Sequence, residues 1–422
     1  MKNKLALLGG EPAVKAPLTL YRSIGAEEEA AVLRVMRSGN LSSFIGAWCD
    51  DFYGGVEVKR FERQWAERFK VKHALSVNSN TSGLIAAMGA IGVSPGDEVI
   101  VPPFSMSATV MAPLFYGGIP VFVDVEPDTF CLDPEKVRAA ITPKTKAIFA
   151  VNMFGHPAHL RELRQLADEK GIYLIEDAAQ SPLAMDGNRY AGTIGHIGVF
   201  SLNYHKHLHT GEGGMCCTDD DDLALRLAGI RNHGENVVKP LGMADITNMV
   251  GFNFRLTELQ AAIGIEQLAK IDTLVQERKT IAEKLTAATR GLPGLTPPVV
   301  HDDCSHVYYV WMAKYDARAT GVPRQKVAAA LVAEGVPIVE GYLTPLYMLP
   351  TFQQRKAIGR EGWPFTLSDR TYEQGLCPVA ERLQDEELLE FCTCSFQLDE
   401  QELSQSIKAF EKVFSNLDQL RA

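Results

Sequence analysis

Residues 146–178 read KAIFAVNMFGHPAHLRELRQLADEKGIYLIEDA and carry the clearest signal of fold class. The two ends, 146–155 and 172–178, are continuous apolar runs of strand length. The segment between them, from about His159 to Lys170, has the pattern of a helix. Strands without polar alternation are buried on both faces, which is typical of a parallel sheet covered by helices. This stretch therefore predicts a mostly parallel α/β sheet.

The same alternation of strands and helices extends toward both ends of the chain. Residues 58–70 predict an amphipathic helix, because Val58, Phe61, Trp65 and Phe69 recur at helical spacing. A short strand, a polar turn and an Ala-rich helix are expected over 74–92. Further buried strands are expected over 98–101, 119–125, 197–202 and 214–217.

A second, smaller domain is expected after a long helix over about 256–290. That helix ends in RGLPGLTPP, a Gly/Pro cluster typical of a domain boundary. Beyond it we expect a strand over 307–314, a helix over 323–334, an irregular Pro-rich stretch over 337–350 and a final helix over 400–417. The prediction is a large domain over 1–290, which includes an N-terminal segment, and a smaller C-terminal α/β domain over 291–422.

Composition and charge narrow the class of protein. The 422 residues are 46% apolar and 22% charged, as in globular proteins. The net charge of −10 provides no overall basic field, so we expect no nucleic-acid partner. No apolar run spans a bilayer, and Leu5–Leu8 is too short for a secretory signal, so we expect a cytoplasmic protein with no membrane partner. The eight cysteines form no Cys-x-x-Cys pair, and we expect reduced thiols and no metal site.

In parallel α/β sheets, ligands bind at the carboxyl ends of the strands, and polar segments follow several of the expected strands. Ser79–Gly83 stands between a strand and a helix, where free backbone N–H groups suit a phosphate or where a Ser or Thr simply caps the helix. Asp177 ends a buried strand and needs a compensating partner, either a cationic ligand nitrogen or a helix N-terminus. Thr257 could in the same way be only the cap of the long helix.

Residues 201–214 read SLNYHKHLHTGEGG and leave two chemistries open. His205, His207 and His209 alternate around Lys206, which is suggestive of a metal site if the three rings converge. Alternatively, Lys206 is a buried amine with a lowered pKa that forms a covalent bond to a carbonyl cofactor. This segment alone does not choose between the two.

The order and spacing of these segments together resemble the DegT/DnrJ/EryC1/StrS family of sugar aminotransferases. In that family an Asp-Ala-Ala-Gln/His segment precedes a Ser, a Lys five residues later, and then Gly-Glu-Gly-Gly. Asp177–Gln180, Ser201, Lys206 and Glu212 keep this order, and the resemblance extends from LALLGG near the N-terminus to CPVAERL at 377–383. It implies a pyridoxal-phosphate (PLP) enzyme of fold type I, the aspartate-aminotransferase fold.

The resemblance also implies a role for each matching residue. Lys206 would hold the cofactor covalently and then act as acid and base. Asp177 would pair with the pyridinium nitrogen and keep the ring protonated as an electron sink. Gln180 would lie near the ring hydroxyl. Asn80 and Thr81 would bind the phosphate.

Three further positions complete the implied site. Ser201 would add a hydroxyl to the phosphate site. Asn253 matches an Asn that reaches the phosphate in the neighbouring subunit, which implies a homodimer with shared sites. Met106 stands where the family usually has an aromatic residue stacked on the ring, so ring stacking should be weaker or different here.

The implied reaction moves an amino group from glutamate to a keto-sugar. Overall likeness favours 8-oxo-3-deoxy-manno-octulosonate, giving 8-amino-3,8-dideoxy-manno-octulosonate for lipopolysaccharide. A nucleotide-linked 4-keto-6-deoxysugar is the alternative substrate. The less favoured alternative is a PLP-dependent sugar dehydratase, a lyase whose branch has His where this chain keeps Lys206.

Two groups of residues bear on the substrate. Asp50 and Asp51, in the segment 44–55 (FIGAWCDDFYGG), would repel a nucleotide diphosphate if they faced the pocket, or they are ordinary solvated loop acids. Arg231 and His233 either meet a substrate carboxylate or lie on the surface.

Overall fold

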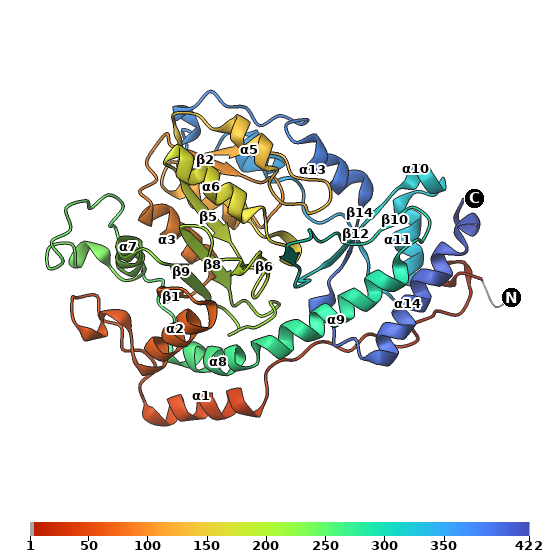
Figure 1. Cartoon of the computed structure of the whole chain (residues 1–422), viewed down its shortest axis with the longest axis horizontal. Coiled ribbons are helices and arrows are strands. Elements are labelled where there is room, and N and C mark those ends of the chain that lie inside the picture. Colours follow the sequence, from red (N-terminus) through yellow and green to blue (C-terminus); the bar gives the residue numbers. More distant parts are fainter. Residues whose placement is uncertain (1–3, 422) are drawn as a thin grey trace.

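A seven-stranded sheet forms the centre of the larger part of the molecule in the computed structural model, which describes residues 4–421 (Figure 1). All neighbouring pairs among β2, β3, β4, β5 and β8 are parallel, and β9 is antiparallel to both β1 and β8. The mostly parallel sheet expected from the sequence is therefore confirmed. In spatial order the strands are β1 (His73–Val77), β9 (Gly214–Thr218), β8 (Ile197–Ser201), β5 (Tyr173–Asp177), β4 (Thr145–Val151), β2 (Glu98–Val101) and β3 (Ile119–Phe122).

The register between β4 and β5 sets the position of the Asp177 carboxylate. Val151 pairs with Asp177, so Asp177 lies level with the end of the neighbouring strand. Every residue of β2, β3, β8 and β9 is buried, as expected for strands covered on both faces. Polar side chains just beyond the strand ends therefore gather at one edge of the sheet.

Helices of the larger part pack on this sheet and on one another. In α2, Val58, Phe61, Trp65 and Phe69 are all buried, which confirms the amphipathic helix. Helix α3 contacts α4 and α7, whereas α6 packs against β4 and β5. The helices are α1 (Ala26–Ser38), α2 (Val56–Phe69), α3 (Asn80–Ala90), α4 (Ala108–Phe115), α5 (Pro134–Ala140), α6 (Leu160–Lys170), α7 (Asp221–Arg231) and α8 (Glu258–Ala269).

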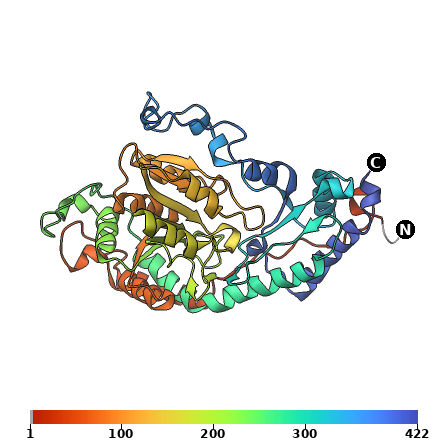
Figure 2. The ribbon, with the colours of Figure 1, turned by 45° about the horizontal axis from the view of Figure 1, so that its top comes forward.

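The long helix expected over 256–290 is two helices, α8 and α9 (Ile271–Thr289), and that part of the prediction was wrong. Lys270 stands between them with φ −96° and ψ −5°, away from regular helix values. Its ammonium lies 2.9 Å from both carboxylate oxygens of Glu28 and 3.1 Å from Glu27, at the start of α1. A tertiary ion pair thus anchors the chain where the helix breaks. Figure 2 shows α9 running from the larger part to the smaller one.

The smaller part is built on a four-stranded sheet. Its strands in spatial order are β10 (Leu295–Thr296), β12 (Trp311–Tyr315), β14 (Leu388–Phe391) and β13 (Val339–Glu340). The strand expected over 307–314 therefore begins later than predicted. The helices after α9 are α10 (Ala317–Thr320), α11 (Arg324–Ala333), α12 (Pro350–Gln353), α13 (Pro378–Arg382) and α14 (Glu400–Phe414). A third, small sheet joins β11 (Cys304–Ser305), β6 (Met185–Asp186) and β7 (Arg189–Tyr190).

Two large hydrophobic clusters cross the proposed division at residue 290. Leu5, Val14 and Leu18 of the N-terminal segment are buried in the cluster of the small sheet, together with α11 and α14. In the other direction, Tyr347 and Phe352 join the cluster of the large sheet. We keep the division into 1–290 and 291–422 as a proposal for the main chain, with these two segments exchanged between the cores.

None of the helices within residues 4–421 combines the length and the apolar content needed to cross a membrane. All eight cysteines are free thiols.

Candidate active site

Asp177 lies at the carboxyl end of β5, where its side chain is buried and accepts hydrogen bonds from three donors. The backbone N–H of Ala179 donates to Oδ1 at 3.1 Å, and the side-chain amide of Asn80 donates to the same oxygen at 3.4 Å. The Thr109 hydroxyl donates to Oδ2 at 3.2 Å. Burial raises the pKa of Asp177, whereas these donors and the positive charge of Lys206 act to lower it. The site holds a carboxylate that a buried cation would stabilise further.

Lys206 lies in the loop that follows β8, and its Nζ is 4.1 Å from the centre of the Tyr309 ring. Burial lowers the pKa of Lys206 to about 8, and the negative charge of Asp177 opposes that shift. Near pH 8 a large share of the amine is therefore neutral and nucleophilic, as a lysine needs for covalent chemistry with a carbonyl. The charges of Lys206 and Asp177 act on each other, so the two side chains lie in the same region of the fold.

The N-terminus of α3 borders this space and fits a phosphate. Ser79 caps the helix, because its hydroxyl accepts from the N–H of Ser82 at 3.0 Å. Asn80 and Thr81 begin the helix, where backbone N–H groups have no helical partner and favour an anion. A Cβ at Gly214, the first residue of β9, would lie 2.8 Å from the backbone nitrogen of Asn80. Glycine at this position therefore lets β9 pack directly against the backbone at the start of α3.

The side chains of Asn80 and Gln180 are already engaged. Besides Asp177, the Asn80 amide donates to the Val199 carbonyl at 3.3 Å. Gln180 Oε1 accepts the N–H of Phe154 at 2.6 Å, and its Nε2 donates to the hydroxyl of Tyr342 at 3.3 Å. Gln180 thus links the loop after β4 to the smaller part of the molecule.

The remaining expected residues lie around this centre with fewer contacts. Ser201 ends β8, and its hydroxyl accepts the N–H of Asn203 at 3.3 Å. Thr81 is exposed, and Met106, in the loop between β2 and α4, is 61% exposed. Asn253 is exposed as well, and among residues 4–421 its side chain makes no hydrogen bond that the structure records, whereas its backbone carbonyl accepts from Asn78 at 3.3 Å.

Four residues at the site were missed by sequence reasoning. Thr109, which bonds to Asp177, stands three residues after Met106 and was given no role from the sequence. Tyr309 and Tyr342 lie more than 100 residues after Lys206, and burial raises the pKa of both. Burial also raises the pKa of Glu390 to about 7, and its charge acts on both tyrosines. Only the fold brings these three to the site.

The three histidines around Lys206 do not converge. His207 is buried with Nε2 2.8 Å from the Val307 carbonyl, and His209 Nδ1 accepts the N–H of Gly211 at 3.3 Å. The His205 ring lies edge-on to Tyr204. A metal site built from this segment is therefore not supported.

Arg231 departs from the expected surface position, whereas His233 agrees with it. Arg231 is fully buried, with Nη1 bonded to Glu62 at 2.5 Å and to the Ser76 carbonyl at 2.9 Å, so it neither lies on the surface nor is presented to a substrate. His233 is partly exposed and pairs with Glu235 at 3.4 Å. Asp50 and Asp51 are exposed in a short 3-10 turn.

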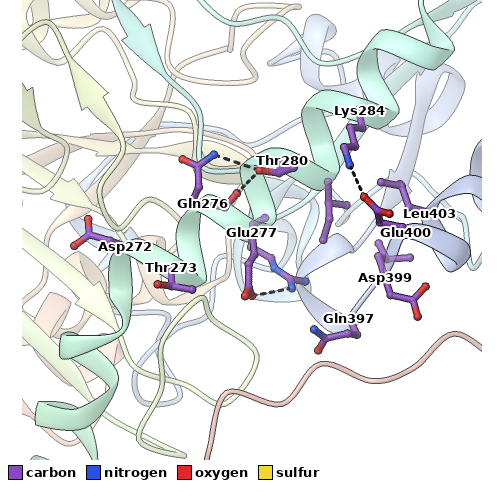
Figure 3. Close-up of a pocket in the computed structure, with 13 residues that line it drawn as sticks. Asp272, Thr273, Gln276, Glu277, Thr280, Lys284, Gln397, Asp399, Glu400 and Leu403 are labelled. Atoms are coloured by element: carbon purple, nitrogen blue, oxygen red, sulfur yellow. Dashed lines mark hydrogen bonds and ion pairs between the residues drawn. The ribbon is translucent and has the colours of Figure 1, made fainter.

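A separate hollow of about 710 Å³ lies between α9 and α14 (Figure 3). It is lined by polar side chains such as Gln276, Lys284 and Glu400, and Lys284 pairs with Glu400 at 3.7 Å. None of the residues that surround Lys206 and Asp177 lines it, so it is distinct from the candidate active site.

Comparisons with known proteins agree with this geometry. The sequence model of the DegT/DnrJ/EryC1/StrS aminotransferase family matches residues 23–394. The L-glutamine:2-deoxy-scyllo-inosose aminotransferase of Streptomyces kanamyceticus is 33% identical over 98% of this chain and 97% of its own. GDP-perosamine synthase of Vibrio cholerae is 33% identical over 81% of this chain and 90% of its own.

A solved structure shows the same fold. DesV of S. venezuelae, in complex with a ketimine intermediate, superposes with a TM-score of 0.75 at 30% identity and covers 92% of this chain and 94% of its own. The chain belongs to the DegT/DnrJ/EryC1/StrS aminotransferase family, and it is a PLP-dependent enzyme of amino-sugar biosynthesis.

Proposed function

We propose that Lys206 and Asp177 hold PLP and that the enzyme passes an amino group from glutamate to a keto-sugar. The observation that carries this proposal is the placement of a lysine with a pKa of about 8 beside a buried carboxylate and the open N-terminus of α3. Bound there, PLP would supply a protonated ring that takes up the electron pair released at the donor carbon. Asp177 would keep that ring protonated through its buried oxygens.

The protein's own contribution to the reaction is positioning and proton transfer. Lys206 Nζ would hold the cofactor covalently at rest, and its amine, once freed, would accept and return the transferred proton at Nζ. Tyr309 holds the ammonium form of Lys206 near the site through its ring face. Thr109 and Asn80 keep the Asp177 carboxylate in place. Asn80, Thr81 and Ser201 would hold the phosphate, and Met106 would contact the ring.

The proposed acceptor is 8-oxo-3-deoxy-manno-octulosonate, with the amino product used for lipopolysaccharide. Support comes from the acidic segment 44–55. Asn232 donates to the carbonyls of Ile45 and Phe52, each at 3.0 Å, and pairs with Asn253 in an isolated β-bridge. If Asn253 reaches the partner's site in a homodimer, the segment that contains Asp50 and Asp51 would approach that same site, because Asn232 joins the segment to Asn253. Their charges disfavour a nucleotide diphosphate more strongly than a sugar with one carboxylate.

A nucleotide-linked 4-keto-6-deoxysugar is the second candidate acceptor. A relative with 81% coverage is named for GDP-perosamine, which favours this class. The relatives that cover nearly the whole chain are instead named for inososes and use L-glutamine. Glutamine is therefore the donor to compare with glutamate.

An absorbance titration tests the function in two halves. Glutamate added to the yellow holoenzyme is expected to bleach its visible band, with glutamine as the comparison. The bleached enzyme is then given the free eight-carbon keto acid or a nucleotide-linked 4-ketosugar, and the acceptor that restores the band is the substrate. A band that neither donor bleaches would contradict amino transfer. A product that has gained no amino group would instead support the lyase alternative.

A further inference from the structure

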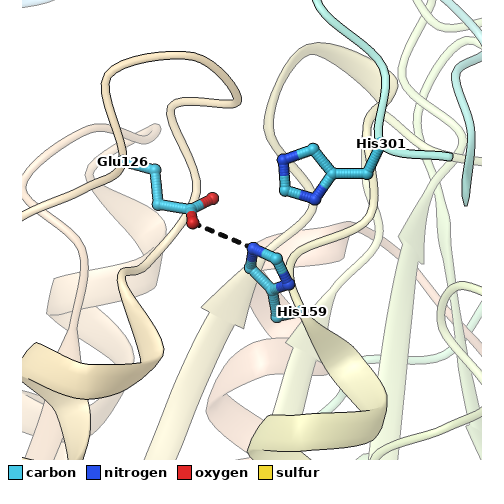
Figure 4. A group of neighbouring side chains, drawn as sticks. All are labelled: Glu126, His159 and His301. Carbon is cyan, nitrogen blue, oxygen red and sulfur yellow. Dashed lines mark hydrogen bonds and ion pairs between the residues drawn. The ribbon is translucent and has the colours of Figure 1, made fainter.

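Glu126, His159 and His301 converge from three separate segments of the chain (Figure 4). Glu126 lies between β3 and α5, His159 is the N-cap of α6, and His301 lies between β10 and β11. One side-chain donor atom from each lies within 4.8 Å of the other two, and Glu126 Oε1 is 2.9 Å from His159 Nε2. All three side chains are partly exposed, so an ion can reach them from solvent.

We propose that these three residues bind one divalent transition-metal ion, with zinc as the best match. Two imidazoles and one carboxylate form a common zinc ligand set, and water completes the coordination. Ligand atoms about 2.0–2.2 Å from a tetrahedral zinc lie about 3.3–3.5 Å apart. The observed spacing requires Glu126 and His159 to separate slightly and the His301 ring to close toward them.

Neighbouring groups hold the ligands in place. The Thr129 hydroxyl donates to Glu126 Oε2 at 2.7 Å, which leaves Oε1 facing the histidines. His156 Nε2 accepts the backbone N–H of His301 at 3.2 Å, and its Nδ1 lies 2.7 Å from the Pro157 carbonyl. His156 is thus a positioning residue whose two ring nitrogens are both used. Supporting hydrogen bonds of this kind are typical of metal sites.

The backbone around His301 is fixed from both sides. Its carbonyl accepts the N–H of Cys304 at 2.9 Å, and Cys304 pairs with Asp186 in the small sheet of β11 and β6. The rings of His159 and His301 lie with centres 4.6 Å apart. The ion pair between Glu126 and His159 is complete with two side chains. A metal ion bound by both of them needs further ligands, and the His301 ring is close enough to provide one.

The position of the cluster in the fold indicates the role of a bound ion. Glu126 and His159 follow strands of the large sheet, whereas His301 lies beyond residue 290 on the chain that leads to the small sheet. A bound ion would fasten this connection to the large domain. The proposed role is structural, and it stands independently of the amino-transfer proposal.

The test of the proposal is zinc binding to the purified holoenzyme, which is first treated with a chelator to remove any bound metal. Isothermal titration with zinc chloride is expected to show one tight site per chain, and zinc is expected to raise the melting temperature. His301→Ala and Glu126→Gln should each weaken zinc binding by at least about tenfold and remove the melting shift.

His73→Ala is the matched control, because His73 Nε2 lies 2.6 Å from Asp221 in an exposed His–carboxylate pair that no third ligand joins among residues 4–421. This variant should bind zinc as the wild type does. Equal zinc affinity in the wild type and His301→Ala would overturn the proposal, and so would the absence of a tight site in the wild type. Two variants at different ligands guard against a fold defect in either one, which their melting temperatures without zinc would reveal.

Discussion

The ammonium nitrogen of Lys206 lies 4.1 Å from the centre of the Tyr309 ring. Tyr309 comes from the segment before β12, so the lysine of the large sheet is packed against the part of the chain that forms the small sheet. A ring face attracts the charged form of an amine, and it opposes the burial that lowers the pKa of Lys206 to about 8.

Tyr309→Leu is expected to lower the pKa of Lys206 further, by less than about one unit, because the ring face that stabilises the ammonium is removed. Tyr309→Phe keeps that face and is the control. The pH dependence of PLP uptake by the cofactor-free enzyme measures this pKa. An unchanged profile in the Leu variant would argue against the ring contact.

Lys206→Ala is expected to lower turnover by about 10²–10⁴-fold or more, because the group that moves the proton is lost. PLP should still bind, without a covalent bond, through Asp177 and the N-terminus of α3. Turnover and the absorbance spectrum of the purified variant check both points. Normal amino transfer would refute the assignment.

Asp177→Asn is expected to weaken PLP binding by about ten- to hundredfold and to slow the reaction with it, because a charge-assisted hydrogen bond becomes a neutral one. The control is Glu176→Gln at the neighbouring buried acid, whose carboxylate accepts N–H groups of Gly192, Ile194 and Gly195. That variant should lose stability and keep its cofactor spectrum. An unchanged rate and affinity in Asp177→Asn would rule out pairing with the ring nitrogen.

Glu390→Gln is expected to make stability less sensitive to pH. The pKa of Glu390 is raised by burial to about 7, so its neutral form is favoured in the folded chain. The stability from that preference is fully present below the ordinary pKa of about 4.3 and is lost as the pH rises to about 7. The variant should therefore gain about 1–3 kcal/mol relative to wild type between pH 5 and pH 8.

Urea unfolding at several pH values measures this difference. Glu373→Gln, at an exposed position, is the control and should show none. A difference between Glu390→Gln and wild type that stays constant with pH would contradict the raised pKa.

Lys206→Ala and Asn253→Ala are expected to complement each other if active sites are shared in a homodimer. Half of the dimers formed by random pairing are mixed, and each mixed dimer has one intact site, so co-expression should restore about one quarter of wild-type activity. Two affinity tags allow the mixed dimer to be purified and assayed. Activity no higher than that of the separate variants would mean that each subunit completes its own site.

Local pattern was enough to predict the sheet, and the family resemblance then pointed to the site residues at its edge. Apolar runs of strand length define β4, β5 and β8, and Asp177 and Ser201 are the polar residues that end two of these buried strands. The spacing from Ser201 to Lys206 set the lysine in the loop that follows. These features depend on residues close together in the chain.

Other features depended on residues that are far apart in the chain. Lys270, at the break between α8 and α9, is paired with Glu28, more than 200 residues earlier, and helical periodicity does not reveal such a contact. The sequence left open whether Arg231 meets a substrate carboxylate or lies on the surface. The structure shows that it is buried against Glu62.

The amino-acid sequence by itself determined the strands, because hydrophobic periodicity is a short-range property, and its motif spacing carried the resemblance that singled out Lys206 and Asp177. Only the tertiary structure decided that Tyr309 packs on Lys206 and that His301 meets Glu126 and His159. The physical reason is that side-chain convergence at the edge of a sheet is set by strand order and domain packing, and neither has a local signature in the chain.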